Sequence, residues 1–185
     1  MRKIIFQMMV SLDGYYEGPG GDIDWHVVDD EFNTYAHKLL ETLDGYIFGR
    51  KTYELMANYW PSGAALQDDP VTARYMNSLH KYVVSRSLKE VKWENSSLLG
   101  GDPSAEITRL KQQQGKDLAI FGSSDLLVSL DQPRLIDEYR IFFAPVVLGS
   151  GKTLLSGIRQ QIKMKLIESL VFKTGVVVNR YTAQE

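Results

Sequence analysis

Three short polar segments follow predicted buried strands and carry groups that bind phosphate. They are Gly49-Arg50-Lys51-Thr52, Ser85-Arg86-Ser87 and Gly122-Ser123-Ser124-Asp125. Phosphorylated nucleotides are bound by backbone N–H groups at helix N-termini, by cationic side chains and by hydroxyl groups. The first segment offers all three, the second adds a cation, and the third adds a helix N-terminus. Taken singly, each segment is better explained as a capped helix start or a polar turn, whereas together they make a dinucleotide site a comparable explanation.

The composition narrows the kinds of protein that this sequence can encode. Its 185 residues include 21 basic and 23 acidic side chains, which gives a formal net charge of −2. A near-neutral chain lacks the basic footprint of general nucleic-acid binders. Cysteine is absent, which excludes disulfide frameworks, thiolate metal sites and cysteine nucleophiles and fits a reducing cytoplasm. His26, His37 and His80 are too widely spaced to form a metal site, so we expect no metal and assign them surface or structural roles.

No segment predicts export or membrane insertion. The N-terminal stretch 1–10 has a charged start and an apolar continuation, but Gln7 interrupts it and no small-residue cleavage pattern follows. The chain also has no apolar run long enough to span a bilayer. We therefore expect a cytoplasmic protein that acts on small molecules, with neither a membrane nor a nucleic acid as partner.

Strand and helix patterns alternate along most of the chain. The predicted strands cover 3–12, 45–48, 81–85, 118–121, 137–144, 162–172 and 176–182. The predicted helices start at Asp29 or Asp30, after Gly49, at Pro70, at Pro103 and near Leu126, and the helical spacing of the first extends to Leu43. This alternation predicts a single α/β domain over residues 1–185, with a mostly parallel sheet that a C-terminal antiparallel β-hairpin makes mixed. Ligands of such sheets bind beyond the carboxyl ends of the strands, where the three polar segments lie.

A fourth segment, Gly149-Ser150-Gly151-Lys152-Thr153, has some letters of an ATPase phosphate loop. That loop requires a glycine where Val146 stands, and it opens a helix, whereas the residues after Thr153 have no helical pattern. The segment is therefore interpreted as a glycine-rich turn after a strand.

Several of these segments also resemble the motifs of one superfamily. Phe48–Glu54 resembles the M-G-R-x-T-[WY]-E segment of dihydrofolate reductases, 120–124 resembles their I-G-G-G segment, and 82–86 their nucleotide-binding strand end. Ser11-Leu12-Asp13-Gly14 and 145–151 are similar to the S-L-D-G and P-x-x-x-G-x-G segments of the bacterial riboflavin-biosynthesis reductase. Together the motifs extend from about residue 5 to about residue 155 in the expected order. The chain thus resembles the dihydrofolate reductase-like superfamily, nearer to its riboflavin-biosynthesis reductase (RibD C-terminal domain-like) branch.

The resemblance implies a three-layer α/β/α fold, bound NADPH and hydride transfer to a small planar heterocycle of the pterin or aminopyrimidine type. It implies that Arg50 and Arg86 hold the cofactor phosphates, including the 2′-phosphate, because the planar fork of arginine binds phosphate bidentately. Gly122, Ser123 and Ser124 would contact the pyrophosphate. The remaining expected cofactor residues are Gly49, Lys51, Thr52, Ser85 and Asp125.

On the substrate side, dihydrofolate reductases carry a carboxylate five residues after a tryptophan, which hydrogen-bonds the pterin. Here Trp25 and Asp30 have that spacing, so Asp30 is the expected catalytic and substrate-binding residue, with helix N-cap as the alternative. The intervening Leu-Pro of the motif is replaced by Val-Val at 27–28. Asp13 is a further candidate substrate residue, with a tight turn at Gly14 as its alternative, and Trp25 either stacks on the heterocycle or covers the core.

A second departure from the motif lies at Gly122-Ser123, where the superfamily usually has two glycines joined by a cis bond. A cis bond to serine costs about 3 kcal/mol, so either the bond is still cis or the pyrophosphate loop differs. Two other functions stay open. The first is the riboflavin-pathway reductase of a ribosylaminopyrimidine phosphate, in which Lys152 would bind the substrate phosphate. The second is a nucleotide-binding protein without catalysis. We also expect a homodimer formed through the C-terminal strands.

Overall fold

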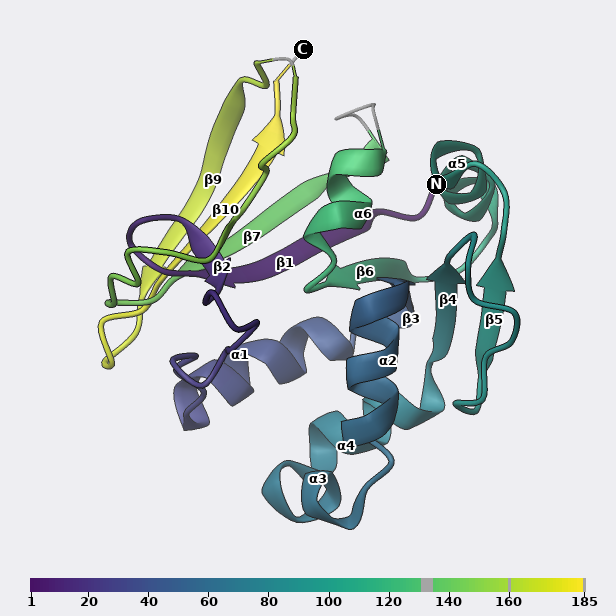
Figure 1. Cartoon of the computed structure of the whole chain (residues 1–185), viewed down its shortest axis with the longest axis horizontal. Helices are drawn as coiled ribbons and strands as arrows, with labels where there is room; N and C mark the ends of the chain where they lie inside the picture. The colour runs from purple at the N-terminus through teal and green to yellow at the C-terminus, as the bar shows by residue number, and fades with distance from the viewer. Residues whose placement is uncertain (131–134, 160, 185) are drawn as a thin grey trace.

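One large sheet organises the chain, which we describe from a computed structural model over residues 1–130, 135–159 and 161–184. Within these residues, eight strands form the sheet in the order β5-β4-β3-β6-β1-β7-β10-β9 (Figure 1). Their bounds are β1 Ile4–Val10, β3 Leu43–Gly49, β4 His80–Val84, β5 Ser96–Leu99, β6 Asp117–Phe121, β7 Glu138–Phe143, β9 Met164–Val171 and β10 Val177–Ala183. The first six strands in this order pair in parallel, and β10 runs antiparallel to both β7 and β9. The predicted mixed, mostly parallel sheet is confirmed.

Helices cover both faces of this sheet. They are α1 Asp30–Leu40, α2 Arg50–Tyr59, α3 Gly63–Asp68, α4 Pro70–Ser78, α5 Pro103–Gln112 and α6 Ser124–Ser129. Ile4, Phe6 and Met8 of β1 pack with α5 and α6, whereas Ile5 and Met9, which point to the opposite face, pack on the side of α1. Figure 1 shows α1 and α2 together on one side of the sheet and α6 on the other, so the three-layer α/β/α arrangement is confirmed.

The first helix ends earlier than its apolar spacing predicts. It stops at Leu40, and Leu43 begins β3, where it is buried in the core. Thr42 Oγ1 donates to the Leu39 carbonyl at 2.7 Å, which satisfies a backbone acceptor at the helix end. Leu43 fits the helical pattern because burial in either element requires an apolar side chain. None of the described helices combines the length and the apolar character needed to cross a membrane.

Two short strands missed by the sequence patterns form a second, small sheet. They are β2 (Tyr15–Glu17) and β8 (Lys152–Thr153), which pair antiparallel. β5 and α3 were also missed, since runs of this length show too few periods to be recognised. β8 follows the glycine-rich turn at 149–151, so this segment leads into a strand and not into a helix. A phosphate loop would lead into a helix, so the interpretation as a turn agrees with the structure.

The start of α1 separates two neighbouring carboxylates. Asp29 is the N-cap, and its Oδ1 accepts a hydrogen bond from the Phe32 N–H at 2.9 Å. Asp30 is the first helical residue, and its side chain is exposed. The cap role that the sequence left open between the two residues belongs to Asp29.

This assignment predicts different effects of two matched substitutions. Asp29→Ala should lower the free energy of unfolding by about 1 kcal/mol, because it leaves a first-turn N–H without its acceptor. Asp30→Ala should change it by less than about 0.5 kcal/mol, because a modest helix-dipole loss is offset by the better helix propensity of alanine. Urea denaturation of the three proteins measures both values, and equal losses in the two variants would contradict the cap assignment.

Candidate functional site

The three phosphate-friendly segments lie together at the carboxyl ends of adjacent parallel strands. Gly49 ends β3, Gly122 follows the neighbouring β6, and Ser85 follows β4, the other neighbour of β3. Two hydrogen bonds join the first two ends. The Gly49 N–H donates to Ser123 Oγ at 3.1 Å, and Thr52 Oγ1 donates to the Gly122 carbonyl at 3.2 Å. The structure therefore brings together the segments that the sequence placed at one edge.

The turn at Gly122 requires glycine. Its φ is +65°, a left-handed conformation that L side chains rarely adopt, and an added Cβ would lie 3.4 Å from Thr52 Cγ2. The peptide bonds of the described residues are all trans, so the Gly122-Ser123 bond differs from the cis bond of the motif. Ser123 is only 4% exposed, and its hydroxyl also donates to the Phe121 carbonyl at 3.4 Å. Its side chain thus ties the strand ends together.

The cations of the site are exposed. Arg50 forms an ion pair with Glu54 on the same helix at 3.2 Å, an exposed contact of little energy that a ligand can replace. Lys51 and Arg86 are exposed, and their side chains have no polar partner within the described chain. Ser85 is nearly buried, and its Oγ accepts hydrogen bonds from the N–H groups of the next turn, so it shapes the backbone beside Arg86.

The helices differ in how their N-termini are capped. Four of the six described helices begin with a side-chain cap, provided by Asp29, Ser62, Asp69 and Asp102. The other two are α2 and α6, whose N-caps Gly49 and Ser123 provide no side-chain hydrogen bond. These are the two helices that start at the joined strand ends. The first-turn N–H groups of α2 accordingly face this edge without a capping side chain and without an acidic neighbour in the first turn.

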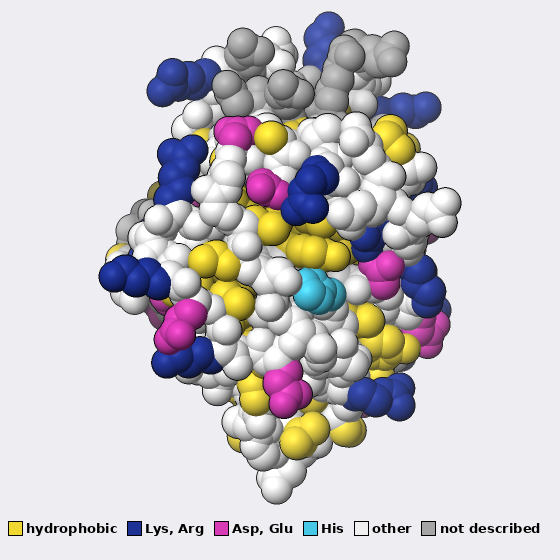
Figure 2. Space-filling model, turned by 90° about the vertical axis from the view of Figure 1, so that its right-hand side faces the viewer, with side chains coloured by type: hydrophobic (Ala, Val, Ile, Leu, Met, Phe, Trp, Pro, Cys, Tyr) yellow, Lys and Arg dark blue, Asp and Glu magenta, His cyan; other side chains and the backbone are white. Residues whose placement is uncertain are grey.

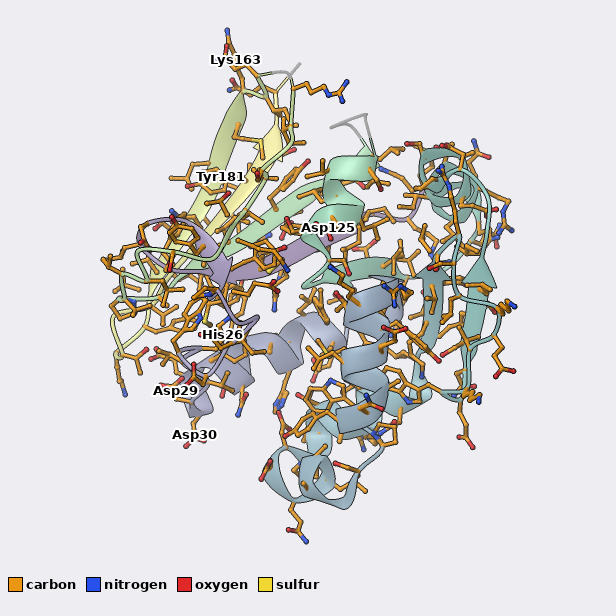
Figure 3. The ribbon with its side chains drawn as sticks, viewed as in Figure 1. His26, Asp29, Asp30, Asp125, Lys163 and Tyr181 are labelled. Atoms are coloured by element: carbon orange, nitrogen blue, oxygen red, sulfur yellow. The ribbon has the colours of Figure 1, made fainter. Side chains whose placement is uncertain are left out.

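An acidic residue, Asp125, adds negative charge at the start of α6. Asp125 is exposed in the first turn of α6, beside the Gly122 turn (Figure 3). A carboxylate there stabilises the helix dipole but opposes an anion.

Lys152 is ion-paired with Glu17, and this hydrogen bond raises the pKa of Lys152. The charge of Lys152 is therefore already compensated within the chain.

Asp13 is occupied by the chain itself. Its carboxylate accepts hydrogen bonds from Ser11 Oγ at 2.6 Å, from the Leu148 N–H at 3.2 Å and from the Gly149 N–H at 2.7 Å. The bonds from Ser11 and from the two amides together outweigh desolvation and lower the pKa of Asp13. Asp13 thus holds its own turn against the distant turn at 148–149, in agreement with the turn alternative.

The structure does not bring Asp30 to the strand ends. Figure 3 shows Asp30 pointing away from the sheet at the start of α1, next to Asp29. Trp25 is half-buried against the core, where its ring packs edge-on against His26 at 4.5 Å and its Nε1 donates to the Asp22 carbonyl at 3.3 Å. The loop between Trp25 and Asp30, which differs from the motif, therefore holds Trp25 against the core and leaves Asp30 pointing away from the sheet.

Two polar residues inside the sheet, Gln7 and Arg140, were not predicted as site residues from the sequence. Parallel register places Phe121 of β6, Gln7 of β1 and Arg140 of β7 side by side on the face that α1 covers. Gln7 Oε1 and Tyr35 Oη are buried without a hydrogen-bond partner. His26 Nε2 is also buried without a partner, and burial lowers the pKa of this histidine. A polar residue in an otherwise apolar strand is the signal that could have found Gln7 and Arg140.

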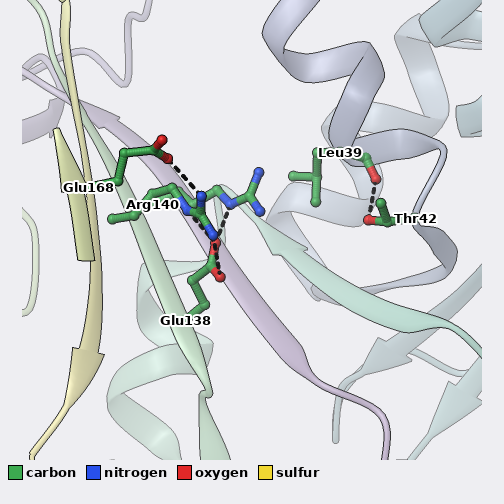
Figure 4. A network of polar contacts seen from close by, with 6 residues as sticks. Leu39, Thr42, Glu138, Arg140 and Glu168 are labelled. Carbon is green, nitrogen blue, oxygen red and sulfur yellow. Dashed lines mark hydrogen bonds and ion pairs between the residues drawn. The ribbon is translucent and has the colours of Figure 1, made fainter. Parts of the chain in front are cut away.

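An ion-pair network surrounds Arg140 (Figure 4). Arg140 Nε donates to Glu138 Oε1 at 2.5 Å. Arg180 of β10 donates through Nε and Nη2 to Glu138, both at 3.0 Å, and through Nη1 to Glu168 at 2.6 Å. Burial acts to raise the pKa of Glu138, but the bonds and charges of the two arginines outweigh it and hold this pKa below its usual range. Both carboxylate oxygens of Glu138 are therefore engaged by arginine.

Comparison with known proteins agrees with this fold. The sequence model of the RibD C-terminal domain family matches residues 2–178 of this chain. The uncharacterized protein YyaP of Bacillus subtilis (strain 168) is 32% identical over 177 residues, which cover 95% of this chain and 92% of that protein. A putative riboflavin biosynthesis protein from Shewanella sp. PV-4 superposes with a TM-score of 0.75 at 23% identity, over 100% of both chains. A dihydrofolate reductase from Enterococcus faecalis, complexed with NADP(H), superposes with a TM-score of 0.67 at 14% identity over 99% of this chain and 97% of its own. The dihydrofolate reductase-like fold is confirmed, and the chain belongs to the RibD C-terminal domain family.

Proposed function

We propose that this protein is an NADPH-dependent reductase that transfers a hydride to a small planar heterocycle of the pterin or aminopyrimidine type. The observation that carries the proposal is the pair of helix starts without side-chain caps, α2 and α6, at the joined ends of β3 and β6. Backbone N–H groups left free at such ends bind the phosphates of nucleotides. The NADP(H) complex of the Enterococcus faecalis reductase, which shares the fold, supports the choice of cofactor.

The residues at this edge fit a dinucleotide phosphate. The backbone of the Gly122 turn and the N-terminus of α2 would contact the pyrophosphate, and the exposed Arg50 and Arg86 would hold the 2′-phosphate. Asp125 does not favour an anion, so we assign its carboxylate to helix stability. When bound, the cofactor supplies the hydride, and the protein's part is to orient the acceptor against it. Phe121 directly precedes the Gly122 turn and Gln7 is its register partner, so we place the acceptor heterocycle beside these two residues.

Two alternatives differ from this proposal in observable ways. A ribosylaminopyrimidine phosphate reductase of riboflavin biosynthesis needs a cation for the substrate phosphate, and Lys152 is already paired with Glu17. A nucleotide-binding protein without catalysis would use the same edge. It would bind NADPH without turning over any pterin or pyrimidine, so turnover assays separate it from a reductase.

The first prediction concerns the cofactor. NADPH should bind to the purified protein, as measured by the change in its fluorescence, and Arg50→Ala and Arg86→Ala should each weaken NADPH about tenfold while changing NADH much less. The reason is that only NADPH presents a 2′-phosphate to a charge-assisted hydrogen bond. Arg109→Ala is the matched control, because Arg109 is also exposed and paired within its helix but lies on α5, away from the strand ends.

Two outcomes would contradict this proposal. If no NADPH binds at a protein concentration of about 100 μM, far above typical cofactor dissociation constants, the reductase function is wrong. If Arg50→Ala and Arg86→Ala weaken NADPH and NADH equally, the reductase function can stand, but the assignment of these residues to the 2′-phosphate is wrong.

We also propose a homodimer through the C-terminal strands. β9 is an edge strand of eight residues that pairs, within the described chain, only with β10. It exposes Leu166, Ile167 and Val171 at 51%, 52% and 71%. An edge of this length with apolar side chains tends to pair with another chain unless it is covered. On another part of the surface, the face turned to the viewer in Figure 2, acidic and basic side chains are interspersed.

Light scattering tests the dimer. The unmodified protein should have about the mass of two chains, because the exposed β9 edge is paired or covered in a dimer. Leu166→Lys should shift it towards a monomer, since a lysine on an edge strand opposes pairing. Leu66→Lys on α3 is the matched control, because Leu66 is equally exposed at 51% and lies on a different element. A monomeric unmodified protein would rule the dimer out.

A further inference from the structure

Two neighbouring arginines of the sheet differ in how their guanidinium groups are used. Arg180 is 27% exposed, and Nε, Nη1 and Nη2 all donate to Glu138 or Glu168. Arg140 is only 13% exposed, yet Nε alone has a partner, and neither Nη1 nor Nη2 finds an acceptor among the described residues. A guanidinium carries five N–H donors, so the four on Nη1 and Nη2 of Arg140 remain available to a ligand. The more buried arginine is thus the less satisfied one.

The unused end of Arg140 points towards α1. The close view shows it extending away from Glu138 towards α1, on the side of Leu39 (Figure 4). Its Cζ lies 5.7 Å from the centroid of the Tyr35 ring, so α1 and the sheet hold the guanidinium from two sides. Because Nε is engaged by Glu138, the two terminal nitrogens remain as adjacent donors in one plane. Two coplanar donors match the two oxygens of a carboxylate.

A second unsatisfied group lies beside Arg140. Gln7 is its register partner on β1, so both side chains project from the same face of adjacent strands. Gln7 Oε1 is buried and has no donor. The other neighbour of Gln7 is Phe121, directly before the Gly122 turn at which we place the cofactor. The unpaired donors and the unpaired acceptor therefore lie next to the place that we propose for the acceptor heterocycle.

We propose that Arg140 binds a carboxylate of the substrate and that Gln7 Oε1 accepts a hydrogen bond from a ring N–H beside that carboxylate. The substrate class is then a planar N-heterocycle with a carboxylate next to a ring N–H, and Arg140 is its specificity-determining residue. This inference rests on the proposed reductase function for the position of the ring, whereas the binding of a carboxylate depends only on the unpaired nitrogens of Arg140.

The sign of the charge separates this proposed site from that of a dihydrofolate reductase. There a carboxylate pairs with a donor edge of the ring, whereas Asp30 is here exposed and Glu138 is saturated by two arginines. A pocket with a free arginine selects acceptor oxygens and leaves a donor edge unpaired. The protein should consequently discriminate against diaminopyrimidines, which present donors.

Isothermal titration with three ring probes tests the proposal, with and without saturating NADPH. The probes are 6-carboxyuracil (orotate), uracil and 2,4-diaminopyrimidine. Orotate should bind at least about tenfold more tightly than uracil, because a charge-assisted pair is worth about that factor or more, and 2,4-diaminopyrimidine should bind most weakly. Arg140→Met should reduce orotate binding to the level of uracil. Equal binding of orotate and uracil, or an unchanged preference in Arg140→Met, would overturn the proposal.

Arg180→Met is the matched control. It removes the paired arginine of the same network, so it should lower the melting temperature and leave the orotate preference in place. If Arg140→Met does not fold, as judged by circular dichroism, Arg140→Lys decides. Lysine keeps the charge beside Glu138 but lacks the planar fork, so the orotate preference should fall, and a full preference in this variant would overturn the bidentate contact.

The two proposals fail in different ways. Orotate binding that depends on Arg140 in a protein that does not bind NADPH would refute the reductase function and leave the carboxylate site standing. NADPH binding by a protein that does not prefer orotate would refute the carboxylate site and leave the reductase function standing.

Discussion

The two-residue alternation of β1 is the constraint on which both the core and the candidate site depend. β1 is central and pairs in parallel on both sides, so its register is set by β6 and β7 together. Ile5 and Met9 bury apolar side chains on the side of α1, and Gln7 lies between them on the same face. A shift of the register by one residue would turn every side chain of β1 to the opposite face of the sheet. The apolar side chains would then lose the partners against which they pack. The packing of the flanking residues therefore fixes where Gln7 stands and which strands it meets.

The helix starts show how one fold separates stability from binding. Four helices satisfy their first turns with Asp or Ser side chains, an arrangement worth about 0.5–2 kcal/mol for each cap. At the joined ends of β3 and β6, Gly49 and Ser123 forgo this contribution. Ser123 instead uses its hydroxyl to hold the two strand ends together. The chain thus holds the two strand ends together while the backbone donors of α2 stay without a side-chain cap.

Sequence patterns predicted the parts of the molecule that depend on local order. The strand-to-helix junctions at Gly49 and Gly122 were found because each is a short run of contiguous residues. Arg140 was not predicted as a site residue, because its position beside Gln7 depends on strand register with a residue more than a hundred positions away in the chain. Asp13 was ambiguous for the same reason, since two of its partners are amides of a distant turn. Asp30 matched a spacing, but the loop before it determines where a side chain points, and spacing alone does not report that.

Gly151 has a consequence for how such chains are recognised. A Cβ at this position would lie 2.1 Å from the Glu17 carbonyl oxygen, so the approach of β2 to β8 admits only glycine. The lysine that follows is held by Glu17, and the threonine after it belongs to β8. The Gly-Lys-Thr letters are thus explained by steric fit and charge pairing between β2 and the segment that leads into β8. A search for the letters Gly-Lys-Thr alone would retrieve this junction, whereas the full phosphate-loop motif excludes it at Val146 and the strand that follows excludes it again.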